Sequence, residues 1–432
     1  MWSCRVDFLL TGVQPLRPIF WARIRFQATI GIVLAAVLPA IGGILFYGIG
    51  TADIGLRNTL IGTSIAIVIG AWLTRNVATY PGSEALASAL SSFSLAFGVL
   101  LIAFVLGRIS YNRTTLLLGY SLTLGWFFLV GALVQRRQQL HIGILPFGDM
   151  GQLPKFPHVT WRVLESPEAS TAGLDAIAAD LRIDLPSEWD RKLADYALAN
   201  MPVYHVKHLM ESLTGMVELE HLSENSFGSL TPRHDYMILK RSIDWLVALA
   251  MGVLLFPFLL LVGLLVRLDS PGPALFRQER IGYQGRPFTV YKFRTMKISA
   301  SNPSAVRDLA ITRDRDNRIT PIGRFLRKSR IDELPQILNV LKGEMSWIGP
   351  RPEASVLSQW YEAEIPFYRY RHVIRPGIAG WAQVCQGHVA DVDDVRSKLH
   401  YDFYYIKQYS PWIDLLIVVR TIRTIITGFG AR

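Results

Sequence analysis

Long runs of apolar residues are the feature that most restricts the fold of this chain. Four of them have about the length that a helix needs to cross a bilayer, at about residues 29–47, 59–74, 86–107 and 115–134. Pro39 lies within the first run, and membrane helices tolerate proline because neighbouring groups satisfy the freed backbone carbonyl. The sequence therefore predicts four transmembrane helices within residues 1–139.

The overall composition agrees with a membrane protein. Hydrophobic residues make up 50% of the 432 residues and charged residues only 18%. The net charge of +11 suits anionic lipid or a phosphate-rich substrate, and the apolar runs favour lipid over nucleic acid. Cys4 and Cys385 are far apart in sequence, so we expect neither a disulfide framework nor a cysteine zinc site.

Basic residues beside the apolar runs favour one orientation only modestly. If both ends of the four-helix unit lie in the cytoplasm, most of these arginines are on the expected side. Those that agree are Arg17, Arg23, Arg25, Arg75, Arg136 and Arg137, and those that disagree are Arg57, Arg108 and Arg113. Residues 1–11 lack the pattern of a cleavable signal, so we expect the N-terminus to remain on the chain.

Residues 140–230 are more polar and predict a small α/β domain. Strand-like runs at 142–145 and 159–163 alternate with helix-like runs at 174–181 and 191–199. Gly148-Asp-Met-Gly151 follows the first strand, where a phosphate loop could lie. It is not a G-x-G-x-x-G, so the sequence does not predict dinucleotide binding there.

A fifth apolar run, at about residues 242–267, contains Pro257 near its middle. Basic residues flank both of its ends, which argues against crossing, and a straight span would carry the following residues to the opposite side of the membrane. We therefore expect a helix that breaks at the proline and returns to the same face, with a straight fifth span as the alternative. The run at 411–429 predicts either an interfacial amphipathic helix or a helix of the soluble core.

The stretch Ser329-Arg-Ile-Asp-Glu-Leu-Pro-Gln-Ile-Leu-Asn339 carries the strongest candidates for chemistry. Asp332 and Glu333 are adjacent carboxylates, and Pro335 and Gly343 indicate a helix that begins beside them. An ionised Asp332 could attack a phosphoryl group and form an aspartyl-phosphoryl intermediate, which implies ping-pong kinetics. Ser329-x-x-Asp332 alone also fits an ordinary capping box.

Five further motifs surround this stretch in a fixed order. They are Ser270-Pro-Gly-Pro273, Gln278-x-Arg280-x-Gly282, Tyr291-Lys-Phe-Arg-Thr-Met296, Gly349-Pro-Arg-Pro352 and Arg375-Pro-Gly377-x-x-Gly380-Trp381. From about Lys240 to the C-terminus, the chain resembles the bacterial polyprenyl-phosphate hexose-1-phosphate transferases.

This resemblance implies transfer of a hexose-1-phosphate from a nucleotide diphosphate sugar, expected to be UDP-linked, to undecaprenyl phosphate. The product would start an exopolysaccharide, capsule or O-antigen repeat. The resemblance also implies a Rossmann-like middle domain over 140–230 and a mainly helical, monotopic transferase domain over 231–432 with a re-entrant helix. It further implies a multi-pass protein of the bacterial inner membrane with its catalytic domain facing the cytoplasm, and the form of longer members suggests a homodimer.

The resemblance gives individual residues a role. It makes Asp332 the nucleophile and Glu333 the metal carboxylate, and Mg²⁺ is the expected ion because it binds through one or two carboxylates plus substrate phosphates. Phosphate and substrate contacts are expected from basic residues and from Asp316, with a solvated arginine or a turn aspartate as the alternative for each. The basic candidates are Arg327, Lys292 and Arg294, followed by Arg280, Arg318, Arg351 and Arg375.

Two other classes of function compete with the transferase. A catalytically inactive membrane scaffold for polysaccharide assembly would keep the helices but would not need both Asp332 and Glu333. A transporter would need polar or charged residues inside its spans, and the first four runs are nearly free of them. No residue pattern selects among glucose, galactose and an N-acetylated sugar.

Overall fold

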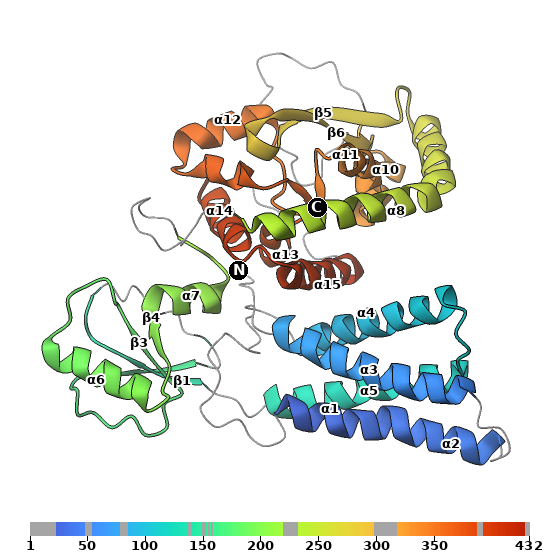
Figure 1. Ribbon diagram of the computed structural model, residues 1–432. Helices are drawn as coiled ribbons and strands as arrows, with labels where there is room; N and C mark the ends of the chain where they lie inside the picture. The colour runs from blue at the N-terminus through green and yellow to red at the C-terminus, as the bar shows by residue number, and fades with distance from the viewer. Residues whose placement is uncertain are drawn as a thin grey trace. The chain divides into compact units, whose positions relative to one another are not determined.

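The protein is mostly helical and contains a small parallel sheet (Figure 1). The computed structural model describes residues 23–47, 54–77, 85–135, 140–148, 153, 156, 159–218, 232–297, 318–386 and 392–427. The chain divides between Gly215 and Met216 into two compact units. Within the described residues, five helices are long and apolar enough to cross a membrane.

All four apolar runs at the start of the chain form helices, as the sequence predicts. The elements are α1 (Ile24–Ile32), η2 (Val33–Val37), α2 (Leu38–Tyr47), α3 (Ile54–Val77), α4 (Ala85–Leu106) and α5 (Arg113–Gln135). The first helix continues through Pro39 because a π-helical turn, η2, comes directly before it. Such a turn accommodates a residue that has no backbone N–H to donate.

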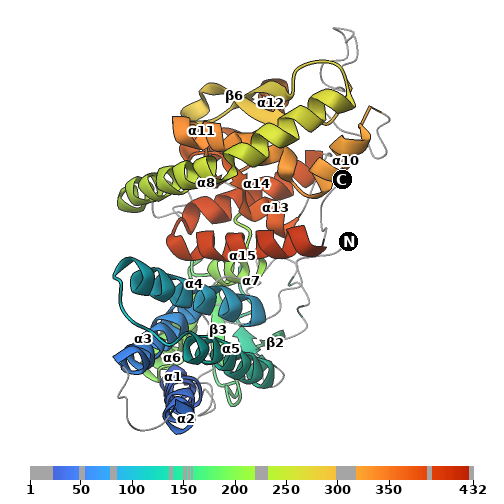
Figure 2. The same cartoon turned by 90° about the vertical axis from the view of Figure 1, so that its right-hand side faces the viewer.

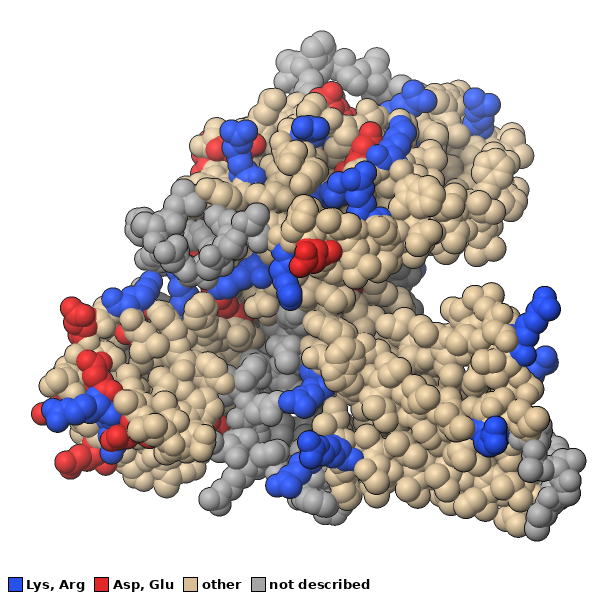
Figure 3. Space-filling view, in the orientation of Figure 1, with Lys and Arg blue, Asp and Glu red and all other residues tan. Residues whose placement is uncertain are grey.

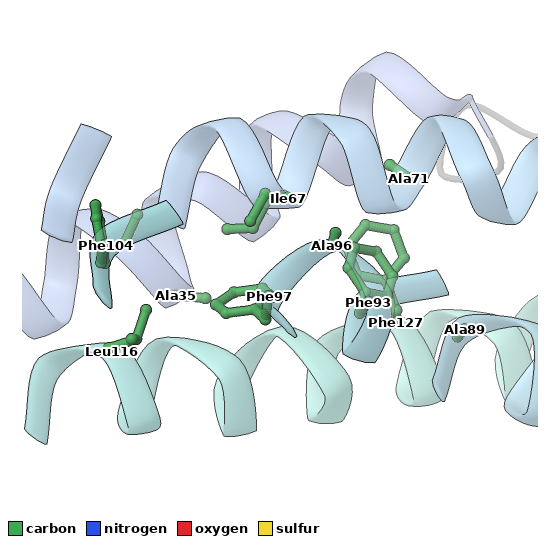
Figure 4. Close-up of a cluster of buried hydrophobic side chains, with 12 residues drawn as sticks. Ala35, Ile67, Ala71, Ala89, Phe93, Ala96, Phe97, Phe104, Leu116 and Phe127 are labelled. Atoms are coloured by element: carbon green, nitrogen blue, oxygen red, sulfur yellow. The ribbon is translucent and has the colours of Figure 1, made fainter. Parts of the chain in front are cut away.

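Small residues allow these helices to pack closely. Figure 4 shows Phe93 and Phe127 in contact within the bundle, where their ring centroids are 4.3 Å apart. A Cβ atom on Gly70 would lie 2.2 Å from the ring of Phe93, so only glycine fits at this point of α3. The outer surface stays apolar, and Figure 3 shows few charged side chains on the visible face of α3, α4 and α5.

The small α/β domain has four parallel strands in the order β2-β1-β3-β4. Its elements are β1 (Leu140–Ile144), β2 (Val159–Val163), β3 (Ala176–Ala179), α6 (Ser187–Leu198), β4 (Val203–His205) and α7 (Val206–Thr214). Both predicted strands and the second predicted helix are confirmed. The helix predicted at 174–181 is wrong, because these residues form β3, whose four residues are all buried. A central parallel strand is covered on both faces and therefore lacks the alternation that marks a strand in sequence.

The second unit begins with α8 (His234–Asp269), which contains Pro257. The expected interruption at this proline is wrong, because the helix is continuous. Pro257 instead lies within a helix whose ribbon changes direction before it reaches β5 (Figure 1). A proline inside a helix removes one backbone hydrogen bond and bends the helix, which needs no break in the chain.

Both ends of α8 are bonded to the same unit. Near its start, the buried Lys240 amine donates to Asp414 Oδ2 at 2.6 Å, and the Ser346 hydroxyl donates to Asp244 Oδ2 at 2.5 Å. At its far end, the Arg294 guanidinium donates to the carbonyl oxygen of Val266 at 3.2 Å. The two halves of α8 also pack on two hydrophobic clusters of this unit, around Ala248 and around Val262.

The rest of the second unit is built from short elements. They are β5 (Leu275–Ile281), η3 (Tyr283–Gly285), β6 (Pro287–Phe293), α10 (Pro321–Lys328), η5 (Ile331–Gln336), α11 (Ile337–Lys342), β7 (Ser346–Ile348), α12 (Ser355–Glu364), η6 (Tyr368–Val373), β8 (Gly377–Ala379), α13 (Trp381–Cys385), α14 (Val392–Lys407) and α15 (Pro411–Thr427). Strands β5 and β6 form an antiparallel hairpin, and β7 pairs with β8 in parallel. Figures 1 and 2 both show α11 beside α8.

Helix α15 combines the two predicted alternatives. One face is buried in the core of the unit through Ile413, Leu416 and Ile417. Its other face leaves Val418 and Ile422 exposed. The helix therefore belongs to the soluble core on one side and presents an apolar surface on the other.

Candidate active site

The acidic pair lies in a tight link between two helices. Helix α10 ends at Lys328, and η5 begins at Ile331 and leads directly into α11, which ends at Lys342 and is capped by Gly343. Gly343 caps the end of α11 as predicted, whereas Pro335 lies within the 3-10 helix η5, ahead of α11, rather than in the first turn of the α-helix. The capping-box alternative is wrong, because the Ser329 hydroxyl donates backwards to the carbonyl of Phe325 at 2.8 Å. The residue before η5 is Arg330, in the left-handed conformation with φ 58°.

Glu333 is buried among cations. Its Oε1 atom accepts from Lys292 Nζ at 2.9 Å and from Arg351 Nη2 at 2.6 Å, and Arg330 Nη1 lies 3.7 Å away. Burial alone would raise the pKa of Glu333, but Arg351 and Lys292 together hold it well below its usual range. Glu333 is therefore a carboxylate throughout the physiological pH range.

Asp332 has a different environment from its neighbour. It is 9% exposed, and its Oδ1 atom is buried without a hydrogen-bond partner among the described residues. Burial, together with the adjacent negative charge of Glu333, raises the pKa of Asp332 to about 6. A buried acceptor with no partner is costly, so Asp332 carries an oxygen that is available to an incoming group.

The cations around Glu333 come from separate elements. Lys292 is on β6, which packs against η5, and burial lowers its pKa to about 8. Arg351 follows β7, and the pKa of its guanidinium is raised by Glu333. Arg280, on β5, donates to the backbone carbonyl of Pro352, and burial next to Arg351 lowers its pKa to about 10.

Two of the glycine and proline motifs pack directly on each other. A Cβ atom on Gly377 would lie 2.0 Å from the Gly349 nitrogen, and one on Gly380 would lie 2.4 Å from the Gly349 oxygen. The Gly377 nitrogen donates to the Pro350 carbonyl at 2.9 Å. This contact of backbone with backbone needs glycine, and it holds the loop from which Arg351 reaches Glu333.

Other predicted residues lie elsewhere. Arg294 donates to the carbonyls of Val266, Ser270 and Pro271 and so closes the end of α8 rather than contacting the acidic pair. Arg375 donates to the Gly343 carbonyl at 3.1 Å and stacks on a tyrosine ring. For both, a substrate contact stays a prediction.

Three more predicted residues come from the segments beside α10. Arg327 is in the last turn of this helix, where its side chain is partly buried. The Arg318 carbonyl accepts from the Lys297 nitrogen at 2.9 Å. Asp316 lies outside the described residues. Their contacts with substrate also stay predictions.

Comparison with known proteins identifies the family. A family model described as bacterial sugar transferase matches residues 235–428. The chain is 43% identical over 407 residues to the UDP-N-acetylgalactosamine-undecaprenyl-phosphate N-acetylgalactosaminephosphotransferase of Aeromonas hydrophila, covering 93% of this chain and 95% of that protein. The chain belongs to the bacterial sugar transferase family.

Two further relatives each match less than half of this sugar transferase. The UDP-glucose:undecaprenyl-phosphate glucose-1-phosphate transferase of Caulobacter vibrioides is 44% identical over 47% of this chain and 76% of its own length. The protein of the same description from Escherichia coli is 40% identical over 43% of this chain and 39% of its own length. The residues that the family model matches contain Asp332 and Glu333.

Sequence reasoning missed the charged groups behind the site. Arg371, on η6, donates to the Arg351 carbonyl at 2.9 Å and to Asp402 Oδ2 at 2.8 Å. Glu353 is paired with Lys398, and although burial alone would raise its pKa, Lys398 and Arg371 hold it well below its usual range. Single charged residues on helices give no sequence signal of such pairing, because their partners are far away along the chain.

The carboxylates fit the expected cation in number and chemistry. Among the described residues, no group of three or more His, Cys, Asp or Glu side chains could hold a metal on its own. Magnesium does not need one, because it commonly uses one or two carboxylates and completes its shell with substrate phosphates and water. The unpartnered Oδ1 of Asp332 beside the carboxylate of Glu333 agrees with that pattern.

Proposed function

We propose that this sugar transferase moves a hexose-1-phosphate from a UDP-sugar to undecaprenyl phosphate and so starts a polysaccharide repeat. The observation that carries the proposal is the contrast within the acidic pair. Glu333 is neutralised by Lys292 and Arg351, whereas Asp332 keeps a buried oxygen without a partner. A structural pair of carboxylates would have both members satisfied.

The contrast between Asp332 and Glu333 suggests a transfer in two steps. In the first step, a carboxylate oxygen of Asp332 attacks the phosphorus that carries the sugar, the bridging bond of the diphosphate breaks, and UMP leaves. In the second step, a phosphate oxygen of undecaprenyl phosphate attacks the same phosphorus, and the bond to Asp332 breaks. The products are the lipid diphosphate sugar and a free Asp332 carboxylate, which matches ping-pong kinetics.

The basic residues have a separate task in this scheme. The negative charge on the transferred phosphoryl group needs donors that are already in place, and Lys292 and Arg351 are mostly buried and held by Glu333, next to Asp332 in the chain. Glu333 and Asp332 would hold Mg²⁺, which when bound neutralises charge on the diphosphate. Arg280 supports the loop of Arg351 through the carbonyl of Pro352.

We also propose that α8 enters and leaves the membrane by one face. Lys240 and Asp244 near its start, and Val266 near its end, all bond to side chains of the same unit. A straight span would separate these ends by about 30 Å of hydrocarbon. The change of direction within α8, the helix that contains Pro257, therefore supports a re-entrant helix, with α1 to α5 as four spans and the site on the cytoplasmic side of the inner membrane.

The parallel strand order of the middle domain supports its description as Rossmann-like. A homodimer through this domain stays a prediction. For the donor, one relative that matches along nearly the whole chain is a UDP-N-acetylgalactosamine-undecaprenyl-phosphate N-acetylgalactosaminephosphotransferase. We therefore propose UDP-N-acetylgalactosamine as the first donor to test.

The test measures two signals in purified protein. UMP release is followed with UDP-N-acetylgalactosamine, UDP-N-acetylglucosamine, UDP-glucose and UDP-galactose, with and without undecaprenyl phosphate and Mg²⁺. Radiolabelled sugar is then used to detect a protein-bound phosphosugar in the absence of the lipid. We expect both signals for one donor.

Asp332→Asn should lose both signals, and Asp394→Asn, which changes an exposed carboxylate of α14, should keep them. Full activity in Asp332→Asn would refute the assignment of Asp332 as the nucleophile. No turnover of any nucleotide sugar by the native chain would favour the scaffold function instead.

A further inference from the structure

The loop that carries Arg351 is held along its backbone by other parts of the unit. It lies between β7, which ends at Ile348, and α12, which begins at Ser355, so no helix or strand fixes its course. Instead, the carbonyl oxygens of residues 350–353 each accept a hydrogen bond from elsewhere in the chain. The donors, in that order, are the Gly377 nitrogen, the Arg371 guanidinium, the Arg280 guanidinium and the Ile281 nitrogen. Two of the donors are side chains, so the course of the loop depends on where those side chains are held.

Arg371 is the donor to the carbonyl of Arg351 itself. Its Nη2 atom donates to that carbonyl at 2.9 Å and to Asp402 Oδ2 at 2.8 Å, and its Nη1 atom donates to the Tyr368 hydroxyl at 2.6 Å. The Arg371 side chain is only 3% exposed. One planar guanidinium therefore joins η6, the Arg351 loop and α14, in a geometry that the single ammonium group of a lysine does not reproduce.

The charges around Arg371 balance one another without a ligand. Asp402 is paired with Arg371, Glu353 is paired with Lys398, and Glu353 Oε1 is 4.0 Å from Arg371 Nη1. Lys398 and Asp402 are four positions apart on α14 and so lie on one face of that helix. Two positive and two negative charges leave no excess for a phosphate, so this cluster is not suited to bind substrate. Buried ion pairs also add little net stability, which favours a role in fixing geometry.

The Arg351 side chain extends from the same loop to the acidic pair. Its Nη2 atom donates to Glu333 Oε1 at 2.6 Å. The bond from Arg371 therefore fixes the backbone of the residue whose guanidinium reaches Glu333, beside Asp332. A displacement of about 1 Å at a reacting centre can slow a reaction about a hundredfold, so a small shift of this loop would be felt in the rate.

We propose that Arg371 is a positioning residue, which is held by Asp402 and fixes the loop of Arg351, so that the Arg351 guanidinium is in place for the phosphoryl group transferred at Asp332. This inference rests on the transfer proposed above. Arg371 acts through Arg351 and does not touch the substrate.

The experiment follows the protein-bound phosphosugar in purified native chain and variants, with radiolabelled UDP-sugar and no lipid acceptor. The amount of label bound at completion counts the competent active sites, and the rate constant reports how well each site is arranged. Arg371→Lys keeps the charge and loses the fork. We expect native labelling at completion and a rate constant lower by about tenfold or more. Asp402→Asn, which leaves Arg371 in place with a weaker acceptor, should slow the reaction by about threefold.

Arg369→Lys is the matched control. Arg369 is also on η6, but it pairs with Glu362 at 3.7 Å and has 80% of its side chain exposed. It has no printed bond to the Arg351 loop, and this variant should react at the native rate.

A double-mutant cycle tests whether Arg371 acts through Arg351. In an Arg351→Lys background the guanidinium to be positioned is gone, so adding Arg371→Lys should slow the labelling by less than about twofold. Single-turnover labelling follows even a slow background reaction. A merely structural role would give the same slowing in both backgrounds.

Two results would overturn the role of Arg371. One is equal slowing by Arg371→Lys with and without Arg351→Lys. The other is less label at completion with a native rate constant, which would show a loss of folded protein and no change in geometry. If Arg371→Lys does not fold, the same two criteria apply to Asp402→Asn. A native chain that forms no labelled adduct with any UDP-sugar would instead defeat the proposed transfer, and the role of Arg371 with it.

Discussion

Replacing Asp332 by asparagine should abolish transfer and at the same time stabilise the protein at neutral pH. The two effects have one cause. The native fold holds this carboxylate in a buried place, next to another carboxylate, where its charged form is disfavoured. Asparagine has nearly the same shape and no charge, so it removes the repulsion together with the nucleophile.

The size of the stabilisation follows from the pKa of Asp332. In the unfolded chain the group titrates at the ordinary 3.8, and in the folded protein at about 6. Because the folded state binds this proton more tightly, the group stabilises the fold below pH 3.8, and that contribution is lost as the pH rises through 6. At 1.36 kcal/mol per pH unit, the loss amounts to about 3 kcal/mol at pH 7.5.

Thermal unfolding of detergent-solubilised protein between pH 4 and pH 8 measures this difference. We expect the native chain to lose stability relative to Asp332→Asn as the pH rises, with a gap of several degrees at pH 7.5 that closes near pH 4. Asp394→Asn should follow the native curve. A variant that is less stable than native at pH 7.5, or a gap that does not change with pH, would show that the reasoning about burial and repulsion is wrong.

Three further outcomes are expected. Unlike Asp332→Asn, Glu333→Gln should destabilise the protein, by about 3–5 kcal/mol at neutral pH, because it leaves the cations around this position without their carboxylate. A native-like unfolding temperature would contradict this. In the free enzyme, kcat/KM should rise through about pH 6 as Asp332 loses its proton and fall above about pH 8 as Lys292 does, and a profile that is flat from pH 5 to pH 9 would exclude both assignments. Gly377→Ala should lower the stability by about 3 kcal/mol, because its Cβ would meet backbone at 2.0 Å; expression and unfolding at wild-type levels would show that the loop can move aside.

The long apolar helices could be predicted from sequence because their signal is local. Each apolar run is long enough to be recognised without its neighbours, and the acidic pair stands out because Asp332, Glu333 and Pro335 are close together in the chain. Strand β3 could not be recognised in the same way. Its buried residues lack alternation, and only the neighbouring strands β1 and β4 explain them.

The candidate site shows the same limit. The sequence predicts Lys292, Arg351 and Arg294 alike as binding residues. In the structure Lys292 and Arg351 reach Glu333, whereas Arg294 bonds to the end of α8. Nothing in their sequence contexts predicts this difference. Arg330 was overlooked because it looks like one more charged residue near a helix end. Its left-handed backbone is a three-dimensional property that arises from the link between α10 and η5.

The bond between Lys240 and Asp414 has a consequence for biosynthesis. These residues are 174 positions apart, so the ribosome completes α8 long before it makes the carboxylate that neutralises the lysine. During that interval the base of α8 has a charged amine without its final partner, and the helix can settle into place only after α15 has been translated. A chain that stops before Asp414 would therefore leave this buried lysine with only the more distant carboxylate of Asp244, 3.8 Å away on the same helix, and we expect the cell to degrade it rather than to accumulate a shortened enzyme.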